Sequence, residues 1–194
     1  MRIGIDIDGV LLDSENEIRV AAELYDLIEL KKQGVKHPEG FLEVERYEWE
    51  MKELEKFRNR LVDVELDANP KPGAKRVTNL LKADGHTLVI ISARGIIGPT
   101  VEQTKKQLQE NGFPIDEYYF QVEDKANVCK QAGIDVMIED RAKHCEKIAK
   151  QQITALYFRD VNRKKLEENP YLKEVNTWGE VYRQICKMEG KTFG

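Results

Sequence analysis

Five short runs of apolar, β-branched and aromatic residues along the chain predict the strands of a sheet. The runs cover residues 3–7, 87–91, 118–122, 135–138 and 154–158. Four of them are almost continuously apolar, which is typical of parallel strands covered by helices on both faces. We therefore expect these strands to lie in one buried, parallel sheet.

Helical patterns separate these strands. Apolar residues recur at helical spacing in residues 74–83, 99–110, 126–131, 141–151 and 178–188. Gly85, Gly112 and Gly133 follow three of these segments, as expected where helices end. The alternation of strands with helices predicts an α/β fold with a doubly wound, Rossmann-like parallel sheet.

The long stretch between the first two predicted strands contains no convincing strand. Residues 14–17 (Ser-Glu-Asn-Glu) fit a capping box, and one helical face behind them carries Ile18, Ala21, Tyr25 and Ile28. We therefore expect a helical cap at residues 14–73, inserted after the first strand of an α/β core formed by residues 1–13 and 74–194.

A second helical stripe within this insert carries Tyr47, Met51, Leu54, Phe57 and Leu61. We interpret both apolar stripes as the internal packing of the cap. An aromatic residue such as Tyr47 or Trp49 could instead face a ligand, and the spacing does not choose between these roles.

Charge and cysteine content narrow the function classes. The chain has 31 basic and 35 acidic residues and a net charge of −4, which gives no reason to expect binding to a nucleic-acid polymer or an anionic membrane. No apolar run is long enough to span a bilayer, and the N-terminal run is too short for a signal peptide. Cys129, Cys145 and Cys186 are scattered and odd in number, so we expect reduced thiols and a cytoplasmic protein. The oligomeric state is not predicted.

Polar residues follow three of the predicted strands at the point where each strand ends. Asp6 and Asp8 follow the first strand, Ser92 follows the second, and the pair Glu139-Asp140 follows the fourth. In a doubly wound sheet the carboxyl ends of the strands share one rim, where ligands bind. These side chains can therefore converge on one crevice.

The residue types at this rim suit the transfer of a phosphoryl group. Several carboxylates on one edge suit a hard divalent cation such as Mg²⁺. The hydroxyl of Ser92 and the ammonium of Lys125, which precedes a short helix, are complementary donors for a phosphate. One carboxylate can attack the phosphoryl group to form an aspartyl-phosphate, and a second can act as acid and base.

Four segments in a fixed order carry a resemblance to a known family. They are Asp6 to Leu11, Ile90 to Arg94, Lys125, and Ile138 to Asp140. Together they resemble the four motifs of the haloacid dehalogenase-like phosphohydrolase superfamily. Within it, the helical insert and the Ile-Glu-Asp-Arg segment at 138–141 are most similar to 5′(3′)-deoxyribonucleotidases and their bacterial relatives.

The resemblance implies a role for each motif. Asp6 would be the nucleophile and Asp8 the general acid and base, which favours phosphate hydrolysis over dehalogenase-type chemistry. Phosphoryl oxygens would be bound at Ser92 and Lys125, with Gly9 and Ala93 beside them. Mg²⁺ would be held by the Asp6 side chain, the Asp8 backbone carbonyl and an acid of the fourth motif.

The fourth motif departs from the family pattern. It contains Glu139-Asp140, whereas the similar nucleotidases have two aspartates there. We expect Glu139 to face the metal and Asp140 to support Lys125 or a metal-bound water, although the longer glutamate leaves this order open.

Other residues with chemical potential carry weaker signals. Arg94 could steady a phosphate, contact a base or cap the next turn. Gly95 and Gly98 form neither a dinucleotide-binding nor a P-loop motif. His144 and its neighbour Cys145 lack the partner pair of a metal site, so we expect structural or surface roles. Asp160 and Asn162 follow the last predicted strand and are expected to be loop residues.

The sequence thus predicts a Mg²⁺-dependent phosphomonoesterase that acts on a small phosphorylated metabolite or nucleotide. A 5′-nucleotidase acting on nucleoside or deoxynucleoside monophosphates is the leading interpretation. The alternatives are a phosphatase of a sugar phosphate or another small ester, and a binding protein without activity. A phospho-accepting receiver domain is disfavoured, because its acceptor aspartate follows a third strand and it has no long insert.

Overall fold

The computed structural model of the chain describes residues 1–40, 43–96, 98–159 and 164–191. Asp160 and Asn162 lie outside these residues. The described residues form a six-stranded sheet in the order β3-β2-β1-β4-β5-β6, and every neighbouring pair is parallel. The strands are β1 (Arg2–Ile5), β2 (Thr87–Ile91), β3 (Glu117–Tyr119), β4 (Val136–Glu139), β5 (Thr154–Phe158) and β6 (Leu172–Val175). The doubly wound parallel sheet predicted from the sequence is confirmed.

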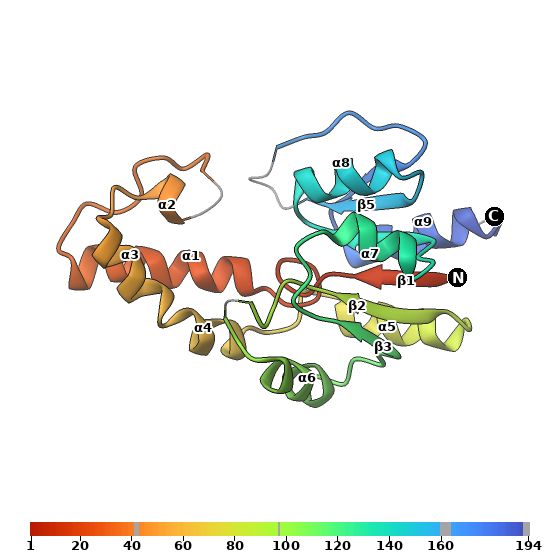
Figure 1. Ribbon diagram of the computed structural model, residues 1–194, viewed down its shortest axis with the longest axis horizontal. Helices are drawn as coiled ribbons and strands as arrows, with labels where there is room; N and C mark the ends of the chain where they lie inside the picture. The colour runs from red at the N-terminus through yellow and green to blue at the C-terminus, as the bar shows by residue number, and fades with distance from the viewer. Residues whose placement is uncertain (41–42, 97, 160–163, 192–194) are drawn as a thin grey trace.

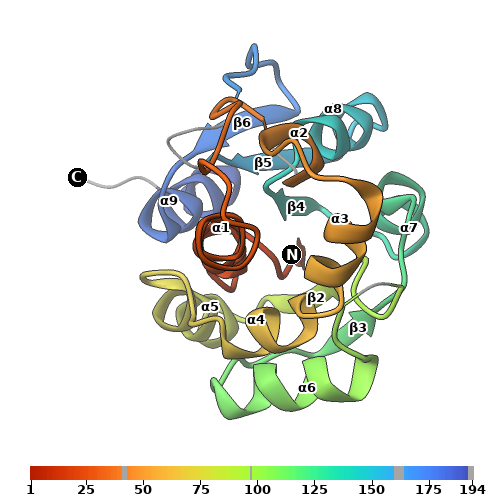
Figure 2. The same ribbon diagram turned by 90° about the vertical axis from the view of Figure 1, so that its left-hand side faces the viewer.

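Helices cover both faces of the sheet (Figures 1 and 2). The helices α5 (Ala74–Ala83), α6 (Val101–Glu110) and α9 (Trp178–Met188) bury apolar side chains in the same cluster as Ile3 and Ile5 of β1. The helices α7 (Lys125–Gln131) and α8 (Ala142–Lys150) pack in the other cluster. Because side chains alternate along a strand, β2, β4 and β5 contribute to both clusters, whereas β1 contributes only to the first, with Gly4 on its other face. No described helix has the length and apolar character needed to cross a bilayer.

The helical insert stands beyond the carboxyl ends of the strands, on the left of Figure 1. It contains α1 (Ser14–Leu24), a π-helical turn η1 (Tyr25–Glu29), α2 (Glu43–Arg46), α3 (Met51–Arg58) and α4 (Leu61–Asp67). Its two ends leave the sheet side by side. The Asp13 amide donates to the Asn69 carbonyl at 2.8 Å, and the Lys71 amide donates to the Leu11 carbonyl at 2.8 Å.

The aromatic residues of the insert pack against one another. Tyr25, Tyr47 and Phe57 are buried, and the Trp49 ring stacks on Tyr47 with a centroid distance of 4.6 Å. Trp49 also meets Tyr25 edge to face at 5.2 Å. These residues form an apolar cluster separate from the two clusters of the sheet. They therefore serve the packing of the insert, as the apolar stripes predicted.

Several predicted elements differ in detail. The strand β1 ends at Ile5 rather than at residue 7, because the amides of Leu11 and Leu12 both donate to the Ile7 carbonyl and draw the chain into a turn. The capping box at residues 14–17 is wrong: the N-cap residue is Asp13, and Ser14 is the first helical residue. Ile28, placed on the buried face of the stripe, is 57% exposed.

Two further differences concern whole elements. The second stripe of the insert is not one helix. Tyr47 lies before α3, and Leu61 lies in α4 because the chain turns at Asn59 and Arg60. The edge strand β6 was not predicted, since its central residues, Lys173 and Glu174, break the apolar pattern.

Candidate active site

Three neighbouring strands bring the predicted site residues to one edge of the sheet. Asp6 follows β1, Ser92 follows β2, and Glu139 ends β4. The strands β2 and β4 flank β1, and Ile5 is level with both Ile90 and Ile138. The polar residues that follow these positions therefore emerge close together at the carboxyl edge.

Lys125 lies between two of the carboxylates. It is the first residue of α7, and its Nζ lies 2.6 Å from Asp6 Oδ2 and 2.7 Å from Glu139 Oε2. Asp6, Lys125 and Glu139 are all buried. Burial disfavours the charged ammonium, but the two carboxylates outweigh this effect and raise the pKa of Lys125. The lysine is therefore a fixed positive charge in the site.

The two carboxylates on either side of Lys125 ionise differently. Burial raises the pKa of Asp6 to about 6, and the charges of Glu139 and Asp8 add to this against the pull of Lys125. Burial also disfavours ionised Glu139, but Lys125 and His144 outweigh it and lower the pKa of Glu139. Glu139 is therefore ionised and forms an ion pair with Lys125.

A group of three buried acids could hold a metal ion. Asp6, Glu139 and Asp140 each offer a carboxylate oxygen, and these oxygens all lie within 4.8 Å of one another. Like charges at this separation in a buried site repel one another. A set that contains only oxygen ligands suits a hard divalent cation, and such a cation would offset the repulsion. The residues present therefore fit a metal ion.

The two acids of the fourth motif point to different surroundings. Glu139 accepts hydrogen bonds from Lys125 and from the Arg141 amide, the latter at 3.0 Å, and is fully buried. Asp140 lines a small cavity at the rim, which Glu139 does not line. This arrangement favours the reverse of the order that we expected, with Glu139 supporting Lys125 and Asp140 facing the cavity.

The carboxylate of Asp8 points to Arg94 instead of the other acids. Arg94 Nη2 donates to Asp8 Oδ1 at 2.7 Å and Nε donates to Asp8 Oδ2 at 3.0 Å. The Ser14 hydroxyl donates to Asp8 Oδ1 at 2.6 Å. Burial opposes ionisation of Asp8, but Arg94 and Ser14 outweigh it and lower its pKa. By its side chain Asp8 lies outside the acidic triad, and our prediction of Asp8 as a metal ligand concerned its backbone carbonyl.

Arg94 links Asp8 to the helical insert. It is buried, and its Nη1 donates to Gln107 Oε1 at 2.7 Å. The Gln107 amide in turn donates to the carbonyls of Glu65 and Leu66 in α4, at 2.8 and 2.7 Å. Of the roles considered for Arg94, capping the next turn is not observed. Its guanidinium is occupied by Asp8 and by the junction with the insert.

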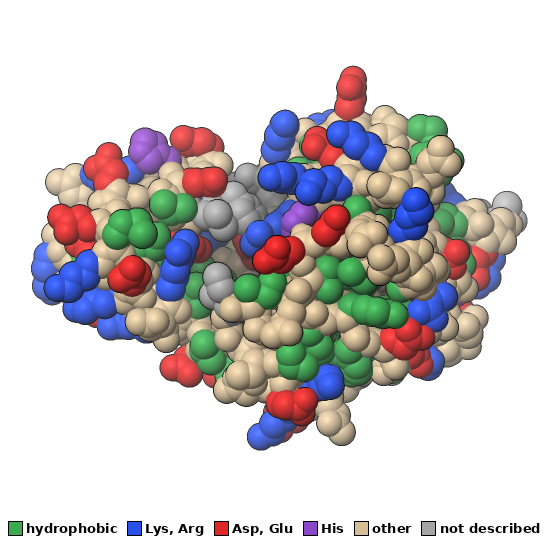
Figure 3. Space-filling view, in the orientation of Figure 1, with side chains coloured by type: hydrophobic (Ala, Val, Ile, Leu, Met, Phe, Trp, Pro, Cys, Tyr) green, Lys and Arg blue, Asp and Glu red, His purple; other side chains and the backbone are tan. Residues whose placement is uncertain are grey.

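Two cavities meet at Asp8. The inner cavity, of about 50 Å³, is lined by Asp6, Ser92, Lys125 and Asp140 among others. The outer cavity, of about 300 Å³, extends under the helical insert. Asp8 and Ala93 line both cavities. Figure 3 shows the surface hollowed between the insert and the sheet, with acidic and basic side chains gathered there.

Gly9 is the one predicted phosphate-binding residue that the structure does not bring to the inner cavity. Its φ of 72° lies in the left-handed region, which suits glycine in the tight turn after Asp8. Its amide donates to the Leu12 carbonyl at 3.0 Å, so the turn itself uses this donor.

Other residues at the site were not predicted for it. Ser14 was interpreted as a helix cap, and Gln107 and Glu65 carried no local signal. His144 Nδ1 lies 3.5 Å from Glu139 Oε1, and the ring lines the inner cavity. Arg141 also lines both cavities. Its position directly after Glu139-Asp140 was the only sequence signal that could have indicated it.

Comparison with known proteins gives matches at the level of structure. No protein-family model matches the sequence, and no curated protein matches it. A haloacid dehalogenase-like family hydrolase from Streptococcus pneumoniae matches with a TM-score of 0.67 at 15% identity, over 95% of this chain and 97% of that chain. A protein described as a predicted phosphatase, from Clostridium acetobutylicum, matches with a TM-score of 0.65 at 17% identity, over 96% of this chain and 98% of that one.

Dehalogenases occur among the similar structures as well. An L-2-haloacid dehalogenase matches with a TM-score of 0.60 at 12% identity, over 95% of this chain and 98% of that chain. At these identities the likeness shows the fold and leaves the reaction open. The chain has the α/β fold of the haloacid dehalogenase-like hydrolases.

Proposed function

We propose that this protein is a Mg²⁺-dependent phosphomonoesterase that uses Asp6 as its nucleophile. The observation that carries this proposal is the buried Asp6 carboxylate, which Lys125 holds at 2.6 Å beside Glu139 and Asp140. A nucleophilic carboxylate, a fixed cation and a metal-binding set of acids meet there at the wall of one cavity. Phosphoryl transfer requires this combination of positioning and charge neutralisation.

The reaction follows from the residues that line the inner cavity. An Asp6 carboxylate oxygen attacks phosphorus, and the bond from phosphorus to the alcohol oxygen breaks with its electron pair on that oxygen. Asp8 gives a proton to the leaving alcohol and then takes one from the water that hydrolyses the aspartyl-phosphate. Inorganic phosphate leaves, and Asp6 is regenerated. The Ser92 hydroxyl and the Lys125 ammonium bind the phosphoryl oxygens throughout.

The metal site would use Asp6 and Asp140, together with the backbone carbonyl of Asp8. When bound, Mg²⁺ supplies positive charge that offsets the negative charge of the phosphoryl group. Glu139 has a different task, since it holds Lys125 in place through the 2.7 Å ion pair.

Asp8 can serve as the acid only in its protonated form. In the described arrangement Arg94 and Ser14 favour its ionised form. We infer that Asp8 turns from Arg94 toward the inner cavity when a phosphate ester binds. The negatively charged phosphoryl group then replaces Arg94 as its nearest charged neighbour and favours the protonated form of Asp8.

The substrate is proposed to be a small phosphorylated metabolite. The sequence resemblance favours a nucleoside or deoxynucleoside monophosphate, and a sugar phosphate or another small ester is the alternative. We also propose a cytoplasmic location, where the buried thiols Cys129, Cys145 and Cys186 would remain reduced.

Substitution of the nucleophile tests the function. Asp6→Asn keeps the size of the side chain but removes the nucleophilic carboxylate, so turnover of a phosphate monoester should fall about 10³-fold or more. Asp63→Asn, at an exposed position of α4, is the matched control and should retain full activity. Both variants are assayed with Mg²⁺ and with a chelator, and their folding is checked by circular dichroism.

The outcomes separate the candidate functions. Retained turnover in Asp6→Asn would refute the assignment of the nucleophile. Equal turnover with Mg²⁺ and with the chelator would refute the metal dependence. A folded wild-type protein that hydrolyses no phosphate monoester would be the binding protein without activity.

A further inference from the structure

The solvent-exposed side of α1 and η1 is apolar. Four large apolar side chains of this segment are exposed, namely Val20 (56%), Leu24 (50%), Leu27 (43%) and Ile28 (57%). Their spacing places them on one side of the helix. Single exposed apolar residues are ordinary, but a contiguous group of them indicates an interaction surface. These four residues are referred to as the outer face of α1.

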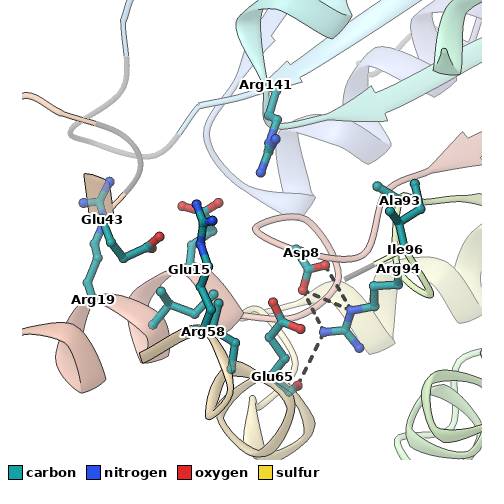
Figure 4. Close-up of a pocket in the computed structure, with 12 residues that line it drawn as sticks. Asp8, Glu15, Arg19, Glu43, Arg58, Glu65, Ala93, Arg94, Ile96 and Arg141 are labelled. Atoms are coloured by element: carbon teal, nitrogen blue, oxygen red, sulfur yellow. Dashed lines mark hydrogen bonds and ion pairs between the residues drawn. The ribbon is translucent and has the colours of Figure 1, made fainter. Parts of the chain in front are cut away.

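The packing of the insert uses the other side of α1. Ala22 and Tyr25 are buried in the aromatic cluster of the insert, and Ile18 packs against it. Glu15 and Arg19 line the outer cavity (Figure 4). The helices α2, α3 and α4 lie together on one side of α1 in Figure 2. Folding of the described residues therefore leaves the outer face of α1 in solvent.

Opposite charges stand at the two ends of the outer face. Glu17 lies three residues before Val20, so it shares its side of the helix, and Lys31 lies two residues beyond η1. Both of these side chains are exposed. Each is seven residues from Leu24, which is about two helical turns. The two charges are therefore about 20 Å apart along the helix and too distant to pair within one chain.

This arrangement makes the outer face complementary to itself. When two copies of α1 meet in antiparallel fashion about a twofold axis at Leu24, Glu17 of each copy lies opposite Lys31 of the other. Val20 then lies opposite Ile28 of the second copy, and the two Leu24 side chains meet at the axis. An interface of this kind uses the same surface on both copies, as twofold symmetry requires. A parallel pairing would instead place like charges opposite each other.

The charge of the helix argues against a lipid surface as the partner. Residues 14–29 contain five acidic residues and one basic residue. Helices that lie on membranes are typically rich in lysine and arginine on their polar face, because these residues attract anionic lipids. An acidic helix whose ends carry opposite charges fits a second copy of itself better.

We propose that the outer face of α1 is the interface of a homodimer, formed by antiparallel pairing of α1 and η1 from two copies of this chain. The four apolar residues are absent from the described lining of both cavities. The dimer can therefore be tested without substituting a residue of the candidate active site, and the inference does not depend on the proposed function.

The molar mass in solution, measured by sedimentation velocity, tests the proposal. We expect the wild type to shift from monomer to dimer as its concentration rises from about 1 µM to about 100 µM, because one helix pair is a small interface. Leu24→Glu places two like charges at the axis, so it should weaken dimerisation by at least about tenfold. Leu80→Glu makes the same change at an exposed position of α5 and should leave dimerisation unchanged. Circular dichroism and thermal unfolding establish that both variants are folded.

Reversal of the end charges tests the antiparallel pairing. Glu17→Lys and Lys31→Glu should each weaken the dimer about three- to tenfold, since each creates two pairs of like charges. The double variant restores opposite charges and should recover the wild-type affinity. Glu55→Lys, at an exposed position of α3, controls for the change in net charge.

The outcomes separate this interface from the alternatives. A wild type that stays monomeric at the highest of these concentrations would overturn the proposal, and Leu24-dependent binding of that monomer to phosphatidylglycerol vesicles would assign the outer face to a lipid surface instead. A dimer that Leu24→Glu does not weaken would place the interface elsewhere. Single charge reversals without effect would refute the antiparallel pairing. Hydrolysis of phosphate esters plays no part in these measurements, so a failure here leaves the proposed function standing.

Discussion

Lys125 is the residue on which the electrostatics of the site depend. Its ammonium neutralises part of the charge that Asp6, Glu139 and Asp140 concentrate in a buried space. Removing one partner of a buried ion pair leaves an uncompensated charge, which costs about 3–5 kcal/mol. Lys125→Met should therefore lower the free energy of unfolding by about this amount in metal-free solution, as measured by urea denaturation.

The same variant tests the metal site without an activity assay. Since a divalent cation can take over the neutralising role of the lysine, Mg²⁺ should stabilise Lys125→Met more than it stabilises the wild type. Asp140→Asn, added to Lys125→Met, should abolish this difference. Lys143→Met, at an exposed position of α8, serves as the control and should change neither value. An unchanged response to Mg²⁺ in Lys125→Met would argue against a cation among these acids.

Glu65 carries a second prediction, which concerns pH. Burial and the nearby charge of Asp8 raise the pKa of Glu65 to about 8, with Glu43 and Glu15 adding to the effect and Arg94 opposing it. In the unfolded chain this carboxyl has its ordinary pKa of 4.5. The folded state therefore binds the proton more tightly, and the contribution of Glu65 to stability is lost as the pH rises from about 4.5 to about 8.

Glu65→Gln removes this loss, because glutamine stays neutral at every pH. Its stability relative to the wild type should increase from pH 5 to pH 8.5, by about 1–2 kcal/mol after allowance for solvent screening. For a chain of this size, each kcal/mol of stability corresponds to a change of about 2–4 °C in Tm. Glu55→Gln makes the same change at an exposed position of α3 and is the matched control. A constant offset between Glu65→Gln and the wild type would contradict the raised pKa.

At the residue scale, the sequence predicts the site residues that directly follow strands. It misses the site residues that other elements of the fold bring into contact with them. Asp6, Ser92 and Glu139 stand directly at strand ends, where the fold class alone brings them together. Ser14 reaches Asp8 across a turn, and Gln107 reaches the insert through contacts 41 and 42 residues apart in sequence. No local pattern marks such contacts, because they depend on how the insert docks.

At the scale of elements, apolar continuity predicts the buried strands well. The strands β2 and β5 occupy the residues expected of them, because every residue but the first of each is buried. The edge strand β6 shows a different pattern, with Leu172 and Val175 buried and the two residues between them partly exposed. An edge strand needs less apolar surface, so periodicity cannot separate it from a loop.

The junction between α6 and α4 is an element-scale feature with a consequence for catalysis. Gln107 accepts from Arg94, which holds Asp8, and donates to two carbonyls of α4. Gln107→Leu should therefore disturb both the seating of the insert and the orientation of Asp8. The proton donation that we propose for Asp8 would matter most when the alcohol is a poor leaving group.

We expect Gln107→Leu to lower kcat about tenfold or more on ethyl phosphate, in line with the 10²- to 10⁴-fold range of acid–base catalysis, and to lower it less on p-nitrophenyl phosphate. Gln109→Leu, at an exposed position of the same helix, is the matched control. A merely structural role for Gln107 would reduce kcat on both substrates by the same factor.

At the scale of the whole molecule, the sheet and the insert differ in how they are stabilised. The two clusters that flank the sheet include every strand residue that is fully buried and apolar, such as Ile3, Ile90 and Met137. The cluster of the insert consists of Ala22, Tyr25, Tyr47, Phe57 and Leu61. Because hydrophobic stabilisation grows with the apolar area buried, the insert should open at a lower free energy than the sheet.

Hydrogen exchange measured by mass spectrometry tests this difference directly. Without ligand, amides of α3 and α4 should exchange faster than those of β1 and β4. Gln107→Leu should lower the protection of α4 further, because it removes the hydrogen bonds to Glu65 and Leu66, and should leave the central strands unchanged. Local opening of the insert would expose the outer cavity and Asp8, which lines it, so this movement could let a substrate reach the candidate site. Equal protection and an equal response to denaturant in α3 and β1 would show that the chain opens only as a whole, and substrate would then have to enter through the cavity mouth without movement of the insert.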